Sequence, residues 1–249
     1  MKIKIFILAI APIVACLFWI YLKDKYEKEP IPILIKYFIL GIISSLLALV
    51  IENLLIKVSI FEGMSLILYT SFIVAGFTEE SLKAMILIPN LLKEKQYNEK
   101  LDGIIYSVFL SLGFAAIENI IYIFYESEEL ILQVSLSRAV IAIPAHIMFA
   151  ITMGYYISKY KFEEKKSKKQ QYIIMAVIIP ILLHGIFDFI LMIKYRWSII
   201  MFIVYIIFLW KINLDKLDKY TNISKIRFLR YIKNRQRKRK TRKKDDRRD

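Results

Sequence analysis

Long apolar runs constrain the fold of this chain more than any other feature of its sequence. A helix that crosses the hydrocarbon core of a bilayer needs about 20 mostly apolar residues. Runs of this kind predict seven membrane helices, at residues 3–22, 32–57, 64–92, 102–125, 133–158, 172–193 and 197–211. Because 57% of the 249 residues are hydrophobic, an ordinary soluble domain is excluded. The sequence therefore predicts an all-α fold, a polytopic bundle of about seven transmembrane helices.

The basic residues are distributed unevenly between the connecting segments. Most of the 37 lysines and arginines lie in the segments 23–31, 93–101 and 159–171 and in the C-terminal tail. In contrast, residues 58–63 hold no lysine or arginine, and residues 126–132 are acidic. Loops rich in lysine and arginine stay on the cytoplasmic side of a membrane. The pattern predicts a multi-pass plasma-membrane protein with its N-terminus outside and its C-terminus in the cytoplasm.

The net charge of +15 belongs mostly to the C-terminal tail. We divide the chain into a transmembrane domain at 1–211, whose motif-bearing core is 64–193, and a basic cytoplasmic tail at 212–249. The first part of the tail has the spacing of an amphipathic helix, and basic amphipathic helices bind anionic lipids. Its last stretch, RQRKRKTRKKDDRRD, is predicted to be disordered. No nucleic acid is expected as a partner, because the inner leaflet already offers an anionic surface.

Several charged and polar residues lie inside the predicted membrane helices. A charge near the centre of a membrane helix costs about 2.5–3.5 kcal/mol on insertion scales, so it usually faces a bundle interior or an aqueous cavity. Both histidines of the chain belong to this set. The set consists of Glu79, Glu80, Lys83, Glu118, Asn119, His146, His184 and Asp188. Three further residues, Glu52, Asn53 and Arg138, lie near outer helix ends, from which their side chains can reach the interface.

Helical spacing pairs some of these residues. Glu79 and Lys83 are four residues apart and share a helix face, which leaves one of the adjacent carboxylates, Glu79 or Glu80, without its charge partner. His184 and Asp188 are also four apart, so Asp188 can orient the imidazole. Counted along their helices, these groups lie between the midplane and the outer surface. We therefore expect a cavity that opens on the extracytoplasmic side.

Two kinds of chemistry use carboxylates and histidines in an intramembrane cavity. In hydrolysis, a glutamate takes a proton from water as general base, while histidines and a further carboxylate bind a metal or act directly. The H-E-x-x-H pattern of soluble zinc proteases is absent from this sequence. In ion- or proton-coupled transport, the same residue types form relays. The residue types leave both kinds of chemistry open. A transporter predicts an internal repeat with broken helices in matching positions, and the sequence shows none.

Four motifs in one order resemble the PrsW family of intramembrane proteases, which shares a superfamily with the prenyl-protein CAAX proteases. They are Glu79-Glu80-x-x-Lys83, Phe114-x-x-x-Glu118 followed by Asn119, then His146, then His184-x-x-x-Asp188. The CAAX branch typically shows EExxxR, whereas residue 84 here is alanine and the basic residue is Lys83. The shorter spacing between the glutamates and the basic residue favours the PrsW family over the CAAX branch. A CAAX-type prenyl endopeptidase-like enzyme or an immunity protein is the second reading, and a transporter is the rival from another class.

The resemblance implies a bacterial plasma-membrane protease that cleaves a single-span membrane protein. Characterised relatives make the first, extracytoplasmic cut in an anti-sigma factor, which leads to sigma factor activation under envelope stress. The catalytic residues that the resemblance implies are Glu79, Glu80, Glu118, His146, His184 and Asp188, with Lys83, Asn119 and Phe114 in support.

The resemblance leaves the cofactor undetermined. In one version, His146, His184 and Glu118 hold a divalent metal such as zinc. In the other, the mechanism is metal-free: one histidine supports the base, and the other histidine, with Asn119 or Asp188, stabilises the oxyanion. In both versions the water-activating base is Glu79 or Glu80.

Overall fold

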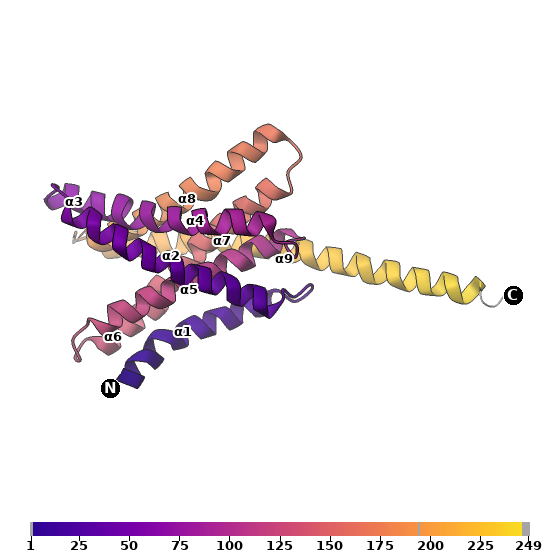
Figure 1. Ribbon diagram of the computed structural model, residues 1–249, viewed down its shortest axis with the longest axis horizontal. Coiled ribbons are helices and arrows are strands. Elements are labelled where there is room, and N and C mark those ends of the chain that lie inside the picture. The colour runs from indigo at the N-terminus through magenta and orange to yellow at the C-terminus, as the bar shows by residue number, and fades with distance from the viewer. Residues whose placement is uncertain (1, 194, 246–249) are drawn as a thin grey trace.

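The structure, a computed structural model, describes residues 2–193 and 195–245, and every regular element in these residues is helical (Figure 1). The elements are α1 (Lys2–Lys23), α2 (Ile31–Lys57), α3 (Gly63–Tyr69), η1 (Thr70–Phe77), α4 (Thr78–Lys93), α5 (Lys100–Phe124), α6 (Ile131–Ser137), η2 (Arg138–Ala142), α7 (Ile143–Lys161), α8 (Lys166–Met192) and α9 (Ser198–Asp245). The predicted all-α bundle is confirmed. The elements η1 and η2 are π-helical and continue directly from α3 and α6, so they bend long helices and do not separate them.

Six segments within the described residues are long and apolar enough to cross a membrane. These are Phe6–Lys23, Ile31–Lys57, Lys100–Phe124, Ile131–Lys161, Lys166–Met192 and Ser198–Arg239. The remaining expected membrane helix, residues 64–92, is present as the continuous run α3–η1–α4 but does not belong to these six. Its charged residues Glu79, Glu80 and Lys83 make the run less hydrophobic than the others.

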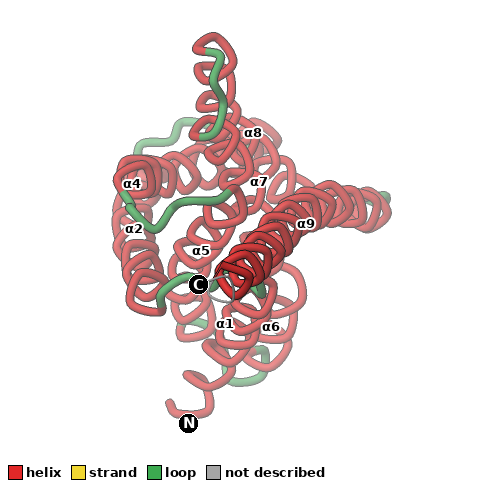
Figure 2. Tube along the Cα trace, turned by 90° about the vertical axis from the view of Figure 1, so that its right-hand side faces the viewer, coloured by secondary structure: helices red, strands yellow, loops and turns green. Residues whose placement is uncertain are grey.

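α5 lies at the centre of the bundle because it is apolar all round. Every residue from Leu101 to Ala116 is buried, and α1, α2 and α7 pack against it. A view along the long axis shows α5 surrounded by the other helices (Figure 2). The motif residues of α5 therefore project from the core of the protein and not from its lipid-facing surface.

Two glycines let α2 and α5 cross with their backbones in contact. A Cβ atom added at Gly113 would overlap the Phe38 carbonyl of α2, and one added at Gly41 would overlap the Leu110 carbonyl of α5. Small residues are typical of membrane helix crossings, because close van der Waals packing stands in for the hydrophobic effect in lipid. The crossing holds α2 against the central helix, where α2 forms one wall of the cavity described below.

Buried carboxyls hold the loops at the end of the bundle that carries the lysine-rich segments. Asp24 Oδ2 accepts a hydrogen bond from the backbone N–H of Glu29 at 2.8 Å, and the Glu29 carboxylate accepts one from the Tyr106 hydroxyl. Asp102 and Glu99 form a capping box at the start of α5. Burial raises the pKa of Asp24 to about 6 and the pKa of Glu29 to about 7, so both carboxyls are neutral more often than exposed ones.

α9 continues from its membrane-spanning part as one long helix, and its C-terminal half leaves the bundle (Figure 1). The boundary expected at residue 211 does not coincide with a break in the helix. The stretch expected to be disordered is helical through Asp245, and residues 246–249 lie outside the described part of the chain. The physical reason is composition: α9 contains no glycine or proline, and lysine, arginine and glutamine are good helix formers.

The crossing of α2 and α5 generates a stability prediction. Gly113→Ala should lower the unfolding free energy by at least about 1–3 kcal/mol, the usual cost of overpacking, because the clash is with backbone that cannot rotate away. Thermal unfolding in detergent measures the effect. Leu46→Ala, on the lipid-facing side of α2, serves as the control. An unchanged thermal unfolding midpoint in the Gly113→Ala variant would contradict the close contact between α2 and α5.

Candidate active site

Two π-helical stretches lead into the residues singled out by the sequence. η1 ends at Phe77, directly before Glu79 and Glu80, and η2 ends at Ala142, shortly before His146. In η2 the N–H of Ile143 bonds to the carbonyl of Arg138, five residues back. Pro144 follows and offers no N–H, so the usual ladder is interrupted here. π-turns inside α-helices frequently occur at functional sites, and each one rotates the following side chains relative to an uninterrupted helix.

η1 and α8 pack closely through two glycines. A Cβ atom at Gly76 would lie 3.0 Å from both the backbone nitrogen of Gly185 and the carbonyl oxygen of Ile181. A Cβ atom at Gly185 would press against the ring of Phe72. This close approach brings the start of α4 against the middle of α8, and the side chains of Glu80 and His184 meet there.

The ammonium group of Lys83 lies between the two adjacent glutamates. Its Nζ atom is 3.1 Å from Oε2 of Glu79 and 2.7 Å from Oε1 of Glu80, and it lies 4.0 Å from the centre of the Phe114 ring. The lysine side chain is 2% exposed. The expected pairing of Glu79 with Lys83 is confirmed, but the idea that the other carboxylate lacks a charge partner is wrong, because one ammonium contacts both.

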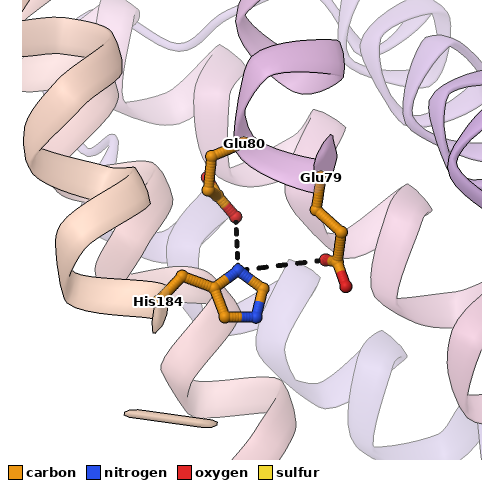
Figure 3. Close-up of side chains that lie close together, drawn as sticks. All are labelled: Glu79, Glu80 and His184. Atoms are coloured by element: carbon orange, nitrogen blue, oxygen red, sulfur yellow. Dashed lines mark hydrogen bonds and ion pairs between the residues drawn. The ribbon is translucent and has the colours of Figure 1, made fainter. Parts of the chain in front are cut away.

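His184 of α8 faces two carboxylates of α4, those of Glu79 and Glu80 (Figure 3). Its Nδ1 is 3.1 Å from Glu80 Oε1 and 4.0 Å from Glu79 Oε2, and its Nε2 is 3.4 Å from Asp188 Oδ2. The Phe149 ring stacks on the imidazole at 4.8 Å. The expected pairing of His184 with Asp188 is confirmed. Because both ring nitrogens face acceptors, the imidazole is held in one orientation.

His146 has a different pair of neighbours, and they define its tautomer. Its Nε2 is 2.7 Å from Glu118 Oε2, and its Nδ1 is 3.4 Å from Nζ of Lys83. An ammonium group can only donate hydrogen bonds, so a neutral His146 accepts at Nδ1 and carries its proton at Nε2, toward Glu118. The Lys83 ammonium therefore links both glutamates of α4 to the histidine of α7.

Arg138 is buried in the structure, although its position near a helix end allowed its side chain to reach the membrane interface. It is 9% exposed. Its Nη2 lies 3.1 Å from Glu118 Oε1, and its Nε donates to Asn119 Oδ1 at 2.7 Å. The Asn119 Nδ2 in turn donates to the carbonyl of Ala9 in α1 at 2.6 Å. Both polar ends of Asn119 are thus occupied, which disagrees with its expected part as an oxyanion donor.

These groups border a cavity of about 740 Å³. Its wall includes Glu79, Glu118, His146, His184 and Asp188, but neither Glu80 nor Lys83 lines it. The wall is built from the C-terminal parts of α2, α5 and α8, from η1 and η2, and from the N-terminal parts of α4 and α7. These parts lie toward the end of the bundle opposite the lysine-rich loops.

The donor atoms at this cavity are of the types that bind zinc, imidazole nitrogen and carboxylate oxygen. Among the described residues, two groups have ligand atoms within 4.8 Å of one another: Glu79, Glu80 and His184, and Glu79, Glu118 and His146. The residues therefore fit a divalent metal. The set expected from the resemblance, which joins both histidines to Glu118, is not one of these two groups.

A helical bundle that buries carboxylates and imidazoles around an intramembrane cavity fits a membrane-embedded protease, and comparison with known proteins establishes this class. Residues 29–212 match the family described as PrsW family intramembrane metalloprotease. The chain is 64% identical over 216 residues to Protease PrsW of Clostridioides difficile (strain 630), covering 87% of this chain and 91% of that protein. It is 34% identical over 207 residues to Protease PrsW of Bacillus subtilis (strain 168), covering 83% of this chain and 91% of that protein. No solved structure matches the chain.

The chain belongs to the PrsW family of intramembrane metalloproteases. It is accordingly a multi-pass membrane protein and a peptidase. The resemblance drawn from the four motifs is confirmed.

Arg138 provides a test of how the site is held together. Arg138→Gln should lower both thermal stability and peptidase activity, because breaking a buried ion pair costs about 3–5 kcal/mol and releases Glu118. Adding Glu118→Gln removes the uncompensated charge and should restore stability without restoring activity. Arg196→Gln, at an exposed arginine, is the control. If Arg138→Gln left stability and cleavage unchanged, the buried pair would have no such role.

Proposed function

We propose that this protease makes the first cut in a single-span anti-sigma factor on the extracytoplasmic side of the plasma membrane. The acid- and histidine-lined cavity supports this proposal, because it lies toward the end of the bundle away from the lysine-rich loops. Lysine-rich loops face the cytoplasm. The cavity lies at the opposite, outer end. The part of a substrate that emerges from the membrane on the outer side can therefore reach it.

We assign Glu79 as the water-activating base, with Glu80 as a positioning residue. The observation that carries this assignment is that Glu79 lines the cavity and Glu80 does not. Glu80 is 1% exposed and is engaged by both Lys83 and His184. A base must reach the proton it removes, within hydrogen-bonding distance of the water. Glu80 instead contacts Lys83 and His184 and keeps both side chains in position next to the cavity.

The reaction follows from these positions. Glu79 takes a proton from water, and the water oxygen attacks the carbonyl carbon of the scissile peptide bond. The oxygen anion forms beside His184 and His146 in the cavity wall, where the nearby cations of Lys83 and Arg138 stabilise negative charge. Glu79 then returns its proton to the amide nitrogen, and the carbon–nitrogen bond breaks. Asp188 and Glu118 keep the two imidazoles oriented during these steps.

A divalent metal, when bound by either of the two donor sets, would polarise the water and the carbonyl group. Glu79 belongs to both sets. Its substitution therefore removes activity under either version of the chemistry.

The assignment of the two glutamates is tested by isosteric variants. Glu79→Gln should reduce cleavage by roughly 10²–10⁴-fold, the usual contribution of a general base, while the protein stays folded and inserted. Glu80→Gln keeps a hydrogen-bond acceptor for Lys83 and should retain measurable cleavage. Glu62→Gln, at an exposed glutamate, is the control. Cleavage of a defined substrate by the purified protein measures all three, and an active Glu79→Gln protein would refute the base assignment.

The substrate proposal is tested by co-expression with candidate single-span anti-sigma factors. We expect a fragment that depends on Glu79, with a cut site, located by mass spectrometry, on the extracytoplasmic side of the substrate's membrane helix. Fusions of a compartment-sensitive reporter to the loops 58–62 and 162–165 determine the orientation of the protease in the same cells. A cut on the cytoplasmic side would contradict the proposed orientation. Cleavage of unrelated membrane proteins alone would contradict the substrate class.

A further inference from the structure

One wall of the cavity comes from α2, which carries none of the four motifs. Its contribution is a single helix face, because the lining positions recur at the three- and four-residue spacing of an α-helix. The lining residues on α2 are Ser45, Ala48, Leu49, Glu52, Asn53 and Ile56. The sequence allowed Glu52 to reach the membrane interface, and the structure places it in this wall, five residues before α2 ends at Lys57.

Glu52 differs from the other carboxylates of the cavity in having no partner. Glu79 pairs with Lys83, Glu118 with Arg138, and Asp188 with His184. Within the described residues, Glu52 makes no hydrogen bond or ion pair, and its Oε1 atom is shielded from solvent. Glu52 is only partly buried, but its shielded Oε1 atom lacks the hydrogen bond that buried polar atoms normally make.

The neighbouring residues do not supply the missing partner. Arg138 is the one lysine or arginine among the described residues that line the cavity, and it is committed to Glu118 and Asn119. The amide of Asn53 donates to the carbonyl of Leu49 at 2.7 Å. Glu52 also belongs to neither of the two donor groups suited to a metal ion. The described residues of the wall therefore leave Glu52 open to a positive charge that a ligand brings.

We propose that Glu52 forms a substrate subsite that binds a lysine or arginine side chain flanking the scissile bond. This inference rests on the proposed function, and it adds a determinant of substrate choice to the cleavage reaction. The long aliphatic stem of lysine or arginine can lie along apolar positions of α2 such as Leu49 and Ile56, with its charged end at Glu52. The occupant is thus both cationic and amphipathic.

The test uses the full-length enzyme in lipid nanodiscs and a single-span substrate whose cut site has been mapped. Residues flanking the cut are changed one at a time to lysine, leucine or glutamate. We expect one position where lysine gives a kcat/KM roughly 10–100-fold higher than leucine, the scale of a partly buried charge pair. Glu52→Gln should remove this preference and leave cleavage of the leucine substrate unchanged. Glu52→Lys should shift the preference to glutamate.

Several outcomes overturn the proposal. One is a lysine preference that persists in the Glu52→Gln enzyme. Another is an equal loss of cleavage for lysine and leucine substrates in an enzyme that still unfolds at the wild-type temperature, since this would indicate a general role for Glu52. Glu62→Gln is the matched control. If no substrate is cut in a Glu79-dependent manner, the proposed function itself fails, which distinguishes the two cases.

Discussion

The rest of the site depends on the ammonium group of Lys83. Two adjacent carboxylates can be buried at the start of α4 because this one cation contacts both of them, at 3.1 and 2.7 Å. The same group faces the ring of Phe114 in α5 and Nδ1 of His146 in α7. A charge that is costly to place in a membrane thereby joins three helices. It also sets the tautomer of the histidine that faces Glu118.

Backbone geometry brings the partners of this cation within reach. η1 and η2 each precede motif residues, and each replaces some i→i−4 bonds by bonds to the fifth residue back. Gly76 and Gly185 allow η1 to approach α8 closely enough for Glu80 to contact His184 at 3.1 Å. The polar groups are consequently held by a rigid framework of close helix crossings. Glu52 stands apart from this network, on the α2 wall, and makes no hydrogen bond or ion pair within the described part of the chain.

Much of the fold and of the site could be predicted from local patterns. Long apolar runs located the helices, and four-residue spacing correctly paired Glu79 with Lys83 and His184 with Asp188. Residues near helix ends were harder to place. The position of Arg138 near a helix end allowed it to reach the interface, yet it is buried against Glu118. Sequence position measures depth along one helix, but it does not show which neighbouring helix supplies a partner.

The sequence by itself determined that this is a polytopic helical membrane protein with carboxylates and histidines at membrane depth, because hydropathy and helical spacing are local properties of the chain. The tertiary structure decided what each polar group faces. Glu79 and Glu80 are adjacent and chemically identical, and both contact Lys83, but the packing of α4 against α8 and α5 leaves Glu79 in the cavity wall and buries Glu80 against His184. Such differences arise from contacts between segments far apart in the chain, which local patterns do not encode.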